Sequence, residues 1–126
     1  MEMKYYICES CGKMIMMATK WDTAVPTMCC GRQMKELVPG TSDGALEKHV
    51  PVVSVEGNRV TVKIGAAEHP MVEAHYIQWI AIETKEGNQM KQLQPGDKPE
   101  AVFMLTDTDS FYAAYEYCNL HGLWKA

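Results

Sequence analysis

Cysteine and histidine are the residue types in this sequence that could do chemistry, and they fall into two groups along the chain. The sequence contains five cysteines and four histidines. Four of the cysteines precede residue 31, whereas every histidine and the last cysteine follow residue 48. An odd number of cysteines, with no secretion signal expected at the amino terminus, is a poor disulfide framework and favours metal binding in a reducing compartment. The sequence therefore predicts two separate metal sites.

The amino-terminal cysteines form a C-x-x-C pair followed by an adjacent pair: Cys8 and Cys11, then Cys29 and Cys30. A C-x-x-C turn directs two thiolates at one centre, and a second pair completes a tetrahedron of four sulfurs. Gly12 and Gly31 each follow a pair and allow the backbone to bend there. The set suits iron or zinc, and the number of ligands does not separate these metals.

Two other interpretations of the amino-terminal cluster are open. A structural zinc ribbon usually has a second C-x-x-C pair, and the adjacent Cys29-Cys30 pair departs from that spacing. A thioredoxin-like redox motif would require a βαβ pattern around Cys8, which the sequence does not have. In either case a small segment with little apolar core would depend on bound metal for its fold.

The histidines form the second candidate set together with the last cysteine: His49, His69, His75 and His121, with Cys118. All lie near expected turns or strand ends, which favours one shared site. Neutral imidazole binds iron, copper, nickel and zinc, but structural zinc takes four ligands, so a set of five favours iron. Five protein ligands leave one position of an octahedral ion open for a small molecule, and a thiolate can push electron density toward it.

Copper and haem fit this set less well. The Cys118-x-x-His121 spacing on a β-sandwich is also typical of blue copper sites, which need a weak axial ligand, often Met, shortly after the His. Residues 122–125 read Gly-Leu-Trp-Lys and contain no Met. A c-type haem requires C-x-x-C-H, whereas Gly12 follows Cys11.

The elements that must position these residues are predicted to be short strands. β-branched and aromatic runs bounded by turn residues predict strands at 50–55, 59–64, 76–84, 89–94, 101–105 and 111–117. Residues 45–48 are expected to form one helical turn. Strands at this spacing predict a sandwich or barrel. Residues 38–44 are rich in turn formers and are expected to be a linker, which divides the chain into domains 1–37 and 38–126.

Composition excludes several classes of protein. The net charge of −4, from 16 acidic and 12 basic residues, argues against a nucleic-acid partner. No apolar run approaches the roughly 20 residues that a membrane-spanning helix needs, so no membrane partner is expected. With 47% apolar residues the chain can bury a core, which argues against disorder.

Motifs spread over essentially the whole chain together resemble one protein family. They are residues 8–12 (CESCG), 29–31 (CCG), 43–51 (DGALEKHVP), 68–71 (EHPM), 75–79 (HYIQW) and 116–126 (EYCNLHGLWKA). The family that they resemble is desulfoferrodoxin, the two-iron class of superoxide reductase. The resemblance implies a mainly β fold. A small desulforedoxin-like domain over residues 1–37 would precede an immunoglobulin-like β-sandwich over residues 38–126.

The resemblance also implies two iron ions per chain and assigns their ligands. The amino-terminal cysteines match an FeS4 centre, in which zinc is possible as well: Cys8, Cys11, Cys29 and Cys30. The four histidines match the equatorial ligands of the catalytic iron, and Cys118 matches its axial thiolate: His49, His69, His75 and His121. One departure is Leu123, where many relatives carry a second His. Leu123 lies outside the ligand set.

Two residues beside His49 are candidate catalytic residues. Lys48 would place a cation next to the site, where it could attract the superoxide anion and orient a proton-donating water. Glu47 resembles the family residue that occupies the vacant sixth position of the oxidised iron. A solvated lysine and a surface carboxylate are the structural alternatives for these two residues.

The activity implied by the resemblance is one-electron reduction of superoxide to hydrogen peroxide. The electron would come from a rubredoxin-like donor, in the cytoplasm of an anaerobe or microaerophile, and the protein would be a homodimer. Three alternatives remain open at this point. They are a non-catalytic electron carrier, a zinc-stabilised binding module and a superoxide dismutase. The FeS4 centre would either relay electrons or hold the fold and dimer together.

Overall fold

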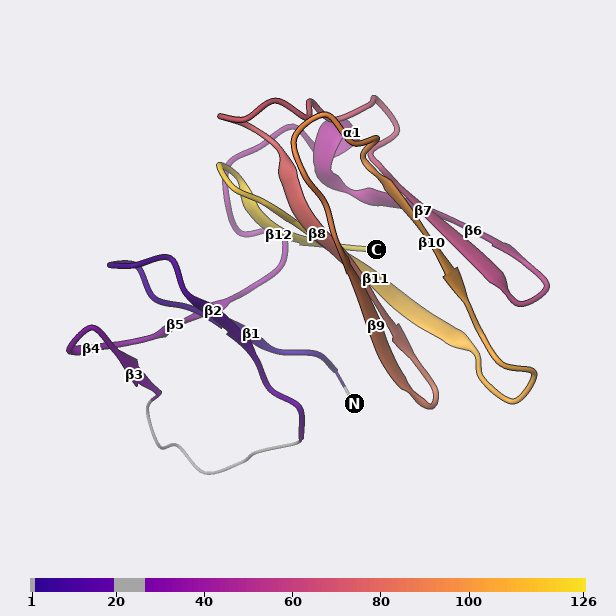
Figure 1. Cartoon of the computed structure of the whole chain (residues 1–126), viewed down its shortest axis with the longest axis horizontal. Helices are drawn as coiled ribbons and strands as arrows, with labels where there is room; N and C mark the ends of the chain where they lie inside the picture. The colour runs from indigo at the N-terminus through magenta and orange to yellow at the C-terminus, as the bar shows by residue number, and fades with distance from the viewer. Residues whose placement is uncertain (1, 20–26) are drawn as a thin grey trace. The chain divides into compact units, whose positions relative to one another are not determined.

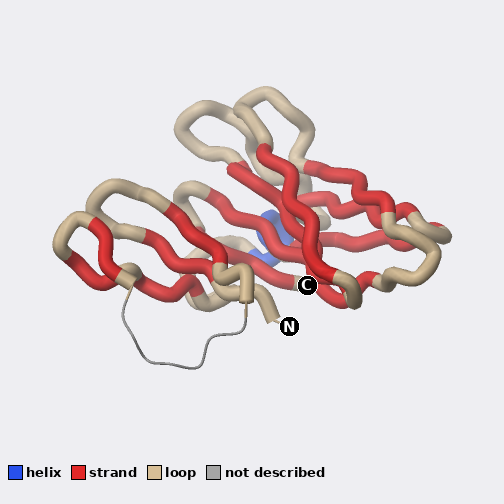
Figure 2. Tube along the Cα trace, turned by 60° about the horizontal axis from the view of Figure 1, so that its bottom comes forward, coloured by secondary structure: helices blue, strands red, loops and turns tan. Residues whose placement is uncertain are grey.

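The structure is a computed structural model that describes residues 2–19 and 27–126. Figure 2 shows that its regular structure consists of strands and one short helix. The chain divides into two compact units, Met1–Val38 and Pro39–Ala126. This boundary lies one residue beyond the predicted one. The mainly β fold class is confirmed.

The first unit is built from very short antiparallel strands. A three-stranded sheet has the order β2-β1-β5, and β3 pairs with β4 in a separate hairpin. The strands are β1 (Tyr5–Ile7), β2 (Met14–Met16), β3 (Met28–Cys29), β4 (Arg32–Gln33) and β5 (Lys35–Leu37). The sequence analysis predicted none of them, because two or three residues are too few to display the alternation that identifies a strand.

The second unit consists of two antiparallel sheets and one helical turn, α1 (Leu46–His49). One sheet has the order β10-β7-β6, and the other has the order β12-β11-β8-β9. The strands are β6 (Pro51–Glu56), β7 (Arg59–Ile64), β8 (Ile77–Thr84), β9 (Gly87–Gln92), β10 (Glu100–Met104), β11 (Phe111–Cys118) and β12 (Gly122–Lys125). In Figure 1 the two sheets of this unit face each other, and β11 contacts both β6 and β7 across the interface.

The core lies between these sheets and follows from the strand alternation. On β7, Val60, Val62 and Ile64 are buried and Arg59 and Lys63 are exposed, as expected for a strand with one face on the core. The buried cluster joins side chains of both sheets, among them Ile80 and Ile82 of β8, Phe103 of β10 and Ala114 and Cys118 of β11. The predicted cysteine ligand is therefore itself part of the apolar core.

Most sequence predictions for this unit are confirmed. Each strand predicted from residue 50 onward is present with ends shifted by a residue or two, and the helical turn is shifted by one. Strand β12 was not predicted. The segment 38–44 has no helix or strand, as expected of a linker. It is nevertheless part of the second unit from residue 39, because the Gly40 N–H donates to the Leu123 carbonyl at 2.9 Å. Within the described residues, no helix is long and apolar enough to span a membrane.

Candidate metal centres

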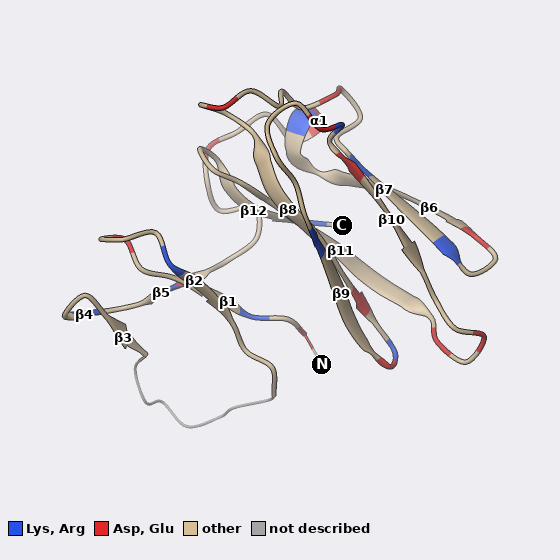
Figure 3. Cartoon of the chain, in the orientation of Figure 1, with Lys and Arg blue, Asp and Glu red and all other residues tan. Residues whose placement is uncertain are grey.

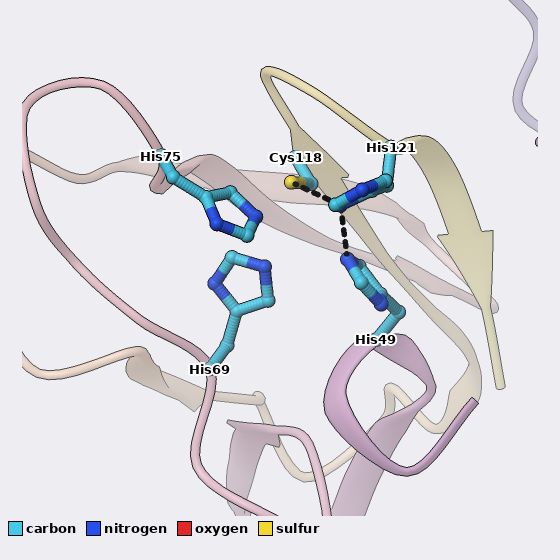
Figure 4. Close-up of side chains that lie close together, drawn as sticks. All are labelled: His49, His69, His75, Cys118 and His121. Atoms are coloured by element: carbon cyan, nitrogen blue, oxygen red, sulfur yellow. Dashed lines mark hydrogen bonds between the residues drawn. The ribbon is translucent and has the colours of Figure 1, made fainter. Parts of the chain in front are cut away.

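The five side chains of the second candidate set meet at one end of the β-sandwich. His49 is the last residue of α1, and His69 and His75 lie on the connection between β7 and β8. Cys118 ends β11, and His121 lies in the turn before β12. Their ligand atoms all lie within 4.8 Å of one another. Figure 4 shows the side chains pointing toward a common centre from these separate segments.

The four imidazoles surround a common centre, and each lies next to two others. Neighbouring ring centroids are 4.8 Å apart for His49 and His69, 4.6 Å for His69 and His75, 5.0 Å for His75 and His121, and 4.8 Å for His121 and His49. Each ring lies edge-on to the next, at interplanar angles of 71–80°. His49 Nε2 and His121 Nδ1 are 3.1 Å apart. Two adjacent nitrogens bound at about 2.1 Å to one ion would lie about 3 Å apart, so the spacing fits a square of ligands.

Hydrogen bonds, burial and proximity together indicate which nitrogen of each ring faces the centre. His49 Nδ1–H donates to the Ala45 carbonyl at 2.8 Å, and His69 Nδ1–H donates to the Pro70 carbonyl at 2.6 Å. A neutral ring that donates through Nδ1 keeps its lone pair on Nε2. The Nε2 atoms of His69 and His75 are buried without a hydrogen-bond partner. Three rings therefore offer Nε2, whereas His121 offers Nδ1.

Burial favours the neutral, metal-binding form of three of the imidazoles, those of His49, His69 and His75. Desolvation lowers the pKa of His49 and His75, and it lowers the pKa of His69 to about 4. Burial also raises the pKa of the Cys118 thiol, although the backbone N–H groups of Leu120 and His121 act in the opposite direction. The Cys118 Sγ lies 3.7 Å from His121 Nδ1. A bound cation would stabilise the thiolate here, so the donor set fits a metal ion.

Trp124 contacts two of the predicted ligand residues, and the sequence analysis did not identify it. Its ring stacks on His49, with centroids 5.0 Å apart and planes 26° apart. Its Nε1–H donates to the His121 carbonyl at 3.0 Å. Trp124 lies inside the motif 116–126, but tryptophan is not a metal ligand, so its residue type did not indicate a role at the site. Leu123, which the family resemblance marked as a departure, is buried on β12.

The two candidate catalytic residues lie on α1 with exposed side chains. Figure 3 shows that this helical turn carries both charges, at Glu47 and Lys48. Among the described residues, the cluster of ligand atoms does not include Glu47. Lys48 lines a surface cavity of about 490 Å³ that adjoins His69. Its other lining residues are Glu68, Pro70, Met71, Asp97, Lys98 and Pro99.

The four amino-terminal cysteines also meet in one cluster. Cys8 and Cys11 lie in the turn between β1 and β2, and Cys29 and Cys30 belong to the hairpin of β3 and β4. Their sulfurs lie within 4.8 Å of one another, with 3.7 Å between Cys11 and Cys29 and 3.9 Å between Cys29 and Cys30. A tetrahedral ion with metal–sulfur distances of about 2.3 Å places its sulfurs about 3.8 Å apart, so the cluster has the size of such a site.

A left-handed turn accommodates the adjacent cysteines. Cys30 and Gly31 are the two loop residues of the hairpin, and their φ angles are +52° and +71°. Positive φ at both positions is the requirement of a type I′ turn, and it is uncommon for a residue other than glycine. Gly12 also has a positive φ, of +78°, and its N–H donates to the Cys8 carbonyl at 2.8 Å. The predicted backbone bends are therefore present at both glycines.

The thiols of this cluster differ in acidity. Hydrogen bonds from the backbone N–H of Cys11, opposed by burial and aided by the N–H of Ser10, lower the pKa of Cys8 to about 6. Hydrogen bonds among the sulfurs raise the pKa of Cys29 and raise that of Cys30 to about 12. Four crowded thiolates repel one another, and a cation at their centre removes that repulsion. The cluster fits a thiophilic metal ion.

A β-sandwich that gathers four imidazoles and a thiolate, in a chain that also carries a four-thiolate cluster, defines a metalloprotein with two mononuclear candidate centres. The sequence profile of one family, Desulfoferrodoxin, matches residues 41–126. The chain belongs to the desulfoferrodoxin family.

Known relatives match nearly the whole chain. A desulfoferrodoxin from Nitratidesulfovibrio vulgaris is 43% identical over 121 residues, which cover 96% of this chain and 93% of that protein. A desulfoferrodoxin homolog from Archaeoglobus fulgidus is 42% identical over 124 residues, which cover 98% and 96%. The crystal structure of the superoxide reductase from Treponema pallidum superposes with a TM-score of 0.84 at 36% identity and covers 100% of this chain and 99% of that one. The expected family is confirmed.

Proposed function

We propose that this chain is a superoxide reductase that converts superoxide to hydrogen peroxide by taking up one electron and two protons. Its homology to superoxide reductases supports the activity. The observation that carries the assignment to a site is the closed arrangement of four imidazoles beside the buried Cys118 side chain. The proposed ligands of the catalytic iron are His49, His69, His75, His121 and Cys118.

An iron ion held by these five residues would supply the electron and one free coordination position. The protein's own groups prepare the site for that ion. Burial favours the neutral form of His49, His69 and His75, and hydrogen bonds to backbone carbonyls fix the rings of His49 and His69, so these groups are prepared to bind a metal ion. Cys118, buried in the apolar core, would hold the ion as a thiolate and would donate electron density to it.

Lys48 and Glu47 are the proposed catalytic residues that act on substrate and product. Lys48 lines the cavity beside His69. There it would attract the superoxide anion and hold a water that donates a proton to the departing peroxide. Glu47 precedes it on the same helical turn, and the family resemblance makes its carboxylate the candidate group that would bind the oxidised iron.

The first unit is proposed to hold a second iron at Cys8, Cys11, Cys29 and Cys30, with zinc as the alternative metal. We propose a rubredoxin-like protein as electron donor, a homodimer as the assembly and the cytoplasm of an anaerobe as the location. We also propose a desulforedoxin-like domain at 1–37 and an immunoglobulin-like domain at 38–126. The family resemblance supports each of these assignments.

The test of this function is metal content, visible spectrum and product stoichiometry of protein from iron-supplied cells. We expect two irons per chain, a thiolate-to-iron absorption band that intensifies on oxidation, and one peroxide for each superoxide when a reductant is present. One peroxide for every two superoxides, without use of the reductant, would identify a dismutase. Iron without superoxide consumption would indicate an electron carrier. Colourless protein with zinc in both sites would identify a binding module.

A further inference from the structure

We propose that Asn119 is a positioning residue for the second centre, because its side-chain amide holds His75 in place relative to Cys118 and His121. This inference rests on the proposed function, since it concerns the ligands of the proposed catalytic iron. Asn119 lies between two of those ligands in the turn from β11 to β12. It is neither a predicted ligand nor a residue placed in contact with substrate.

The backbone of His75 is held by its own loop but lacks a direct link to the opposite turn among the described contacts. The His75 N–H donates to the Val72 carbonyl at 3.0 Å, and the Val72 N–H donates to the His75 carbonyl at 3.1 Å. These two hydrogen bonds close the turn 72–75. They fix its shape without fixing its distance from Cys118 and His121.

Asn119 supplies that link on both sides of His75. Its Nδ2 donates to the Ala74 carbonyl at 3.0 Å, and its Oδ1 accepts from the Tyr76 N–H at 3.0 Å. The Asn119 backbone N–H also donates to the Tyr76 carbonyl, at 3.2 Å. The residues before and after His75 are therefore both attached to one side chain, which itself lies next to Cys118.

The side chain must offer a donor and an acceptor at once, which an amide does. Aspartate has nearly the same shape but no donor at neutral pH, and its carboxylate would face the Ala74 carbonyl oxygen. Serine is too short to reach both backbone groups. The amide cannot be reversed either, because its NH2 would then face the Tyr76 N–H. The residue type is thus specified by the two neighbours of His75.

The position of His75 matters because its ring closes the set of imidazoles. The ring contacts His69 on one side and His121 on the other, at centroid distances of 4.6 and 5.0 Å. Its buried Nε2 has no other partner. Groups that orient metal ligands typically change metal affinity or activity by 10–100-fold when they are mutated. Asn119 orients a whole loop in this way rather than a single ring.

The test compares Asn119→Asp and Asn119→Ser with the wild type, each as the full-length iron-loaded protein. The matched control is Asn88→Asp, the same change at an exposed position of β9. We expect the rate of iron loss from the second centre to a chelator to rise about 10–100-fold in both Asn119 variants. The thiolate-to-iron absorption band should shift in them as well. The control and the first centre of every variant should lose iron at the wild-type rate.

A band and an iron-loss rate like the wild type's, in either folded Asn119 variant, would overturn the proposal even if the melting temperature had dropped. Equal changes in Asn88→Asp would overturn it too. If one Asn119 variant does not fold, the iron-loss rate and absorption band of the other variant still test the proposal. If the wild-type second site holds zinc and does not reduce superoxide, the proposed function fails. The rates of zinc release from wild type and Asn119→Asp then test the positioning role by themselves.

Discussion

Contacts from neighbouring residues orient the predicted ligands of the second candidate centre. His49 is fixed from two directions, since its Nδ1–H binds the Ala45 carbonyl and its face stacks on Trp124. The indole N–H of Trp124 in turn holds the carbonyl of His121. The hydrogen bond to Ala45 leaves the lone pair of His49 on Nε2, the nitrogen near His121 Nδ1. The protein's own contacts therefore hold the four imidazoles in their arrangement around the centre.

Buried ionisable residues at this site give a prediction for the pH dependence of stability. The pKa values of His49, His69 and His75 are below the ordinary 6.5 in the folded chain, and that of His69 is about 4. The unfolded chain therefore binds protons more readily than the folded chain as the pH falls below 6.5. Stability from these groups is complete above pH 6.5 and is lost as the pH falls toward 4.

Glu116 has the opposite effect on the pH dependence of stability. Both of its carboxylate oxygens are buried without a partner, and burial raises its pKa to about 9 from the ordinary 4.5. The folded chain holds this proton and the unfolded chain releases it, so stability falls as the pH rises from 4.5 toward 9. Below pH 6.5 the loss of stability caused by protonation of three imidazoles in the unfolded chain exceeds the gain from the one carboxyl group. The metal-free second unit should therefore be most stable slightly below neutral pH.

The measurement is urea unfolding of metal-free protein between pH 4.5 and 9. Each group contributes a slope of up to about 1.4 kcal/mol per pH unit within its window. Glu116→Gln should remove the decline between neutral pH and about 8, where the buried Cys118 thiol does not yet contribute, and leave the decline on the acid side. An alkaline decline that persisted in Glu116→Gln would show that another group causes it.

The helical turn α1 illustrates how an element too short to be stable alone is held for function. A four-residue helix has almost no intrinsic stability. Its internal bond runs from the Val50 N–H to the Leu46 carbonyl at 3.0 Å. A second bond anchors it to the β7–β8 connection, from the Ala67 N–H to the Glu47 carbonyl at 2.8 Å. His49 is thereby attached to the segment that carries His69 and His75.

The elements also show where sequence reasoning succeeds. β7 was predictable because Val60, Val62 and Ile64 alternate with polar residues over a full strand. The members of both metal clusters were predictable from residue type and spacing, together with the family resemblance. The strands of the first unit were not, because they are too short to show a pattern. The roles of Asn119 and Trp124 were not predictable either, since they arise from contacts between distant segments.

Gly65 should be intolerant of any side chain because of its contact with α1. A Cβ at this position would lie 2.7 Å from the Glu47 carbonyl oxygen and 2.8 Å from the Lys48 carbonyl carbon. Both are backbone atoms that cannot rotate away. We expect Gly65→Ala to displace α1 and His49, to cost about 1–3 kcal/mol of stability and to reduce the iron content of the second centre.

Urea unfolding and metal analysis test this expectation, with Ala66→Ser as the control at the next, exposed position. The iron content of the first centre should be unaffected in both variants. A Gly65→Ala protein with wild-type stability and full iron content would show that α1 can shift without disturbing His49.

The charge of the whole molecule opposes its proposed substrate. The net charge is −4, so the chain as a whole repels an anion such as superoxide, and a local cation must overcome this at the site. Lys48 is the proposed cation. We expect Lys48→Ala to lower the second-order rate with superoxide about tenfold at low salt, and the difference should shrink as ionic strength rises.

Pulse radiolysis or stopped flow at two salt concentrations measures this effect. Lys85→Ala is the matched control, because it removes the same charge from an exposed position beyond the end of β8. An equal loss of rate in both variants would indicate a nonspecific effect of net charge. An unchanged rate in Lys48→Ala at low salt would refute steering by this residue.

The two units differ in the size of their apolar cores, and this difference gives a prediction for metal removal. The buried apolar side chains described in the first unit are few: Met3, Tyr5, Cys8 and Met34. The second unit has an extensive core between two sheets. A unit with so small a core depends on its metal for folding, whereas the second unit does not. We expect Cys29→Ser to remove the first metal and abolish the thermal transition of the first unit.

Calorimetry of Cys29→Ser should show the transition of the second unit within a few degrees of its wild-type temperature. Iron in the second centre and superoxide reduction driven by a small-molecule reductant should be retained. Ser10→Ala, in the turn between the first two cysteines, is the control that should keep both transitions. A single transition that shifts as a whole in Cys29→Ser would mean that the units fold cooperatively. Loss of turnover with a rubredoxin-like donor alone would instead assign the first centre the role of an electron relay, because the catalytic site would still be intact.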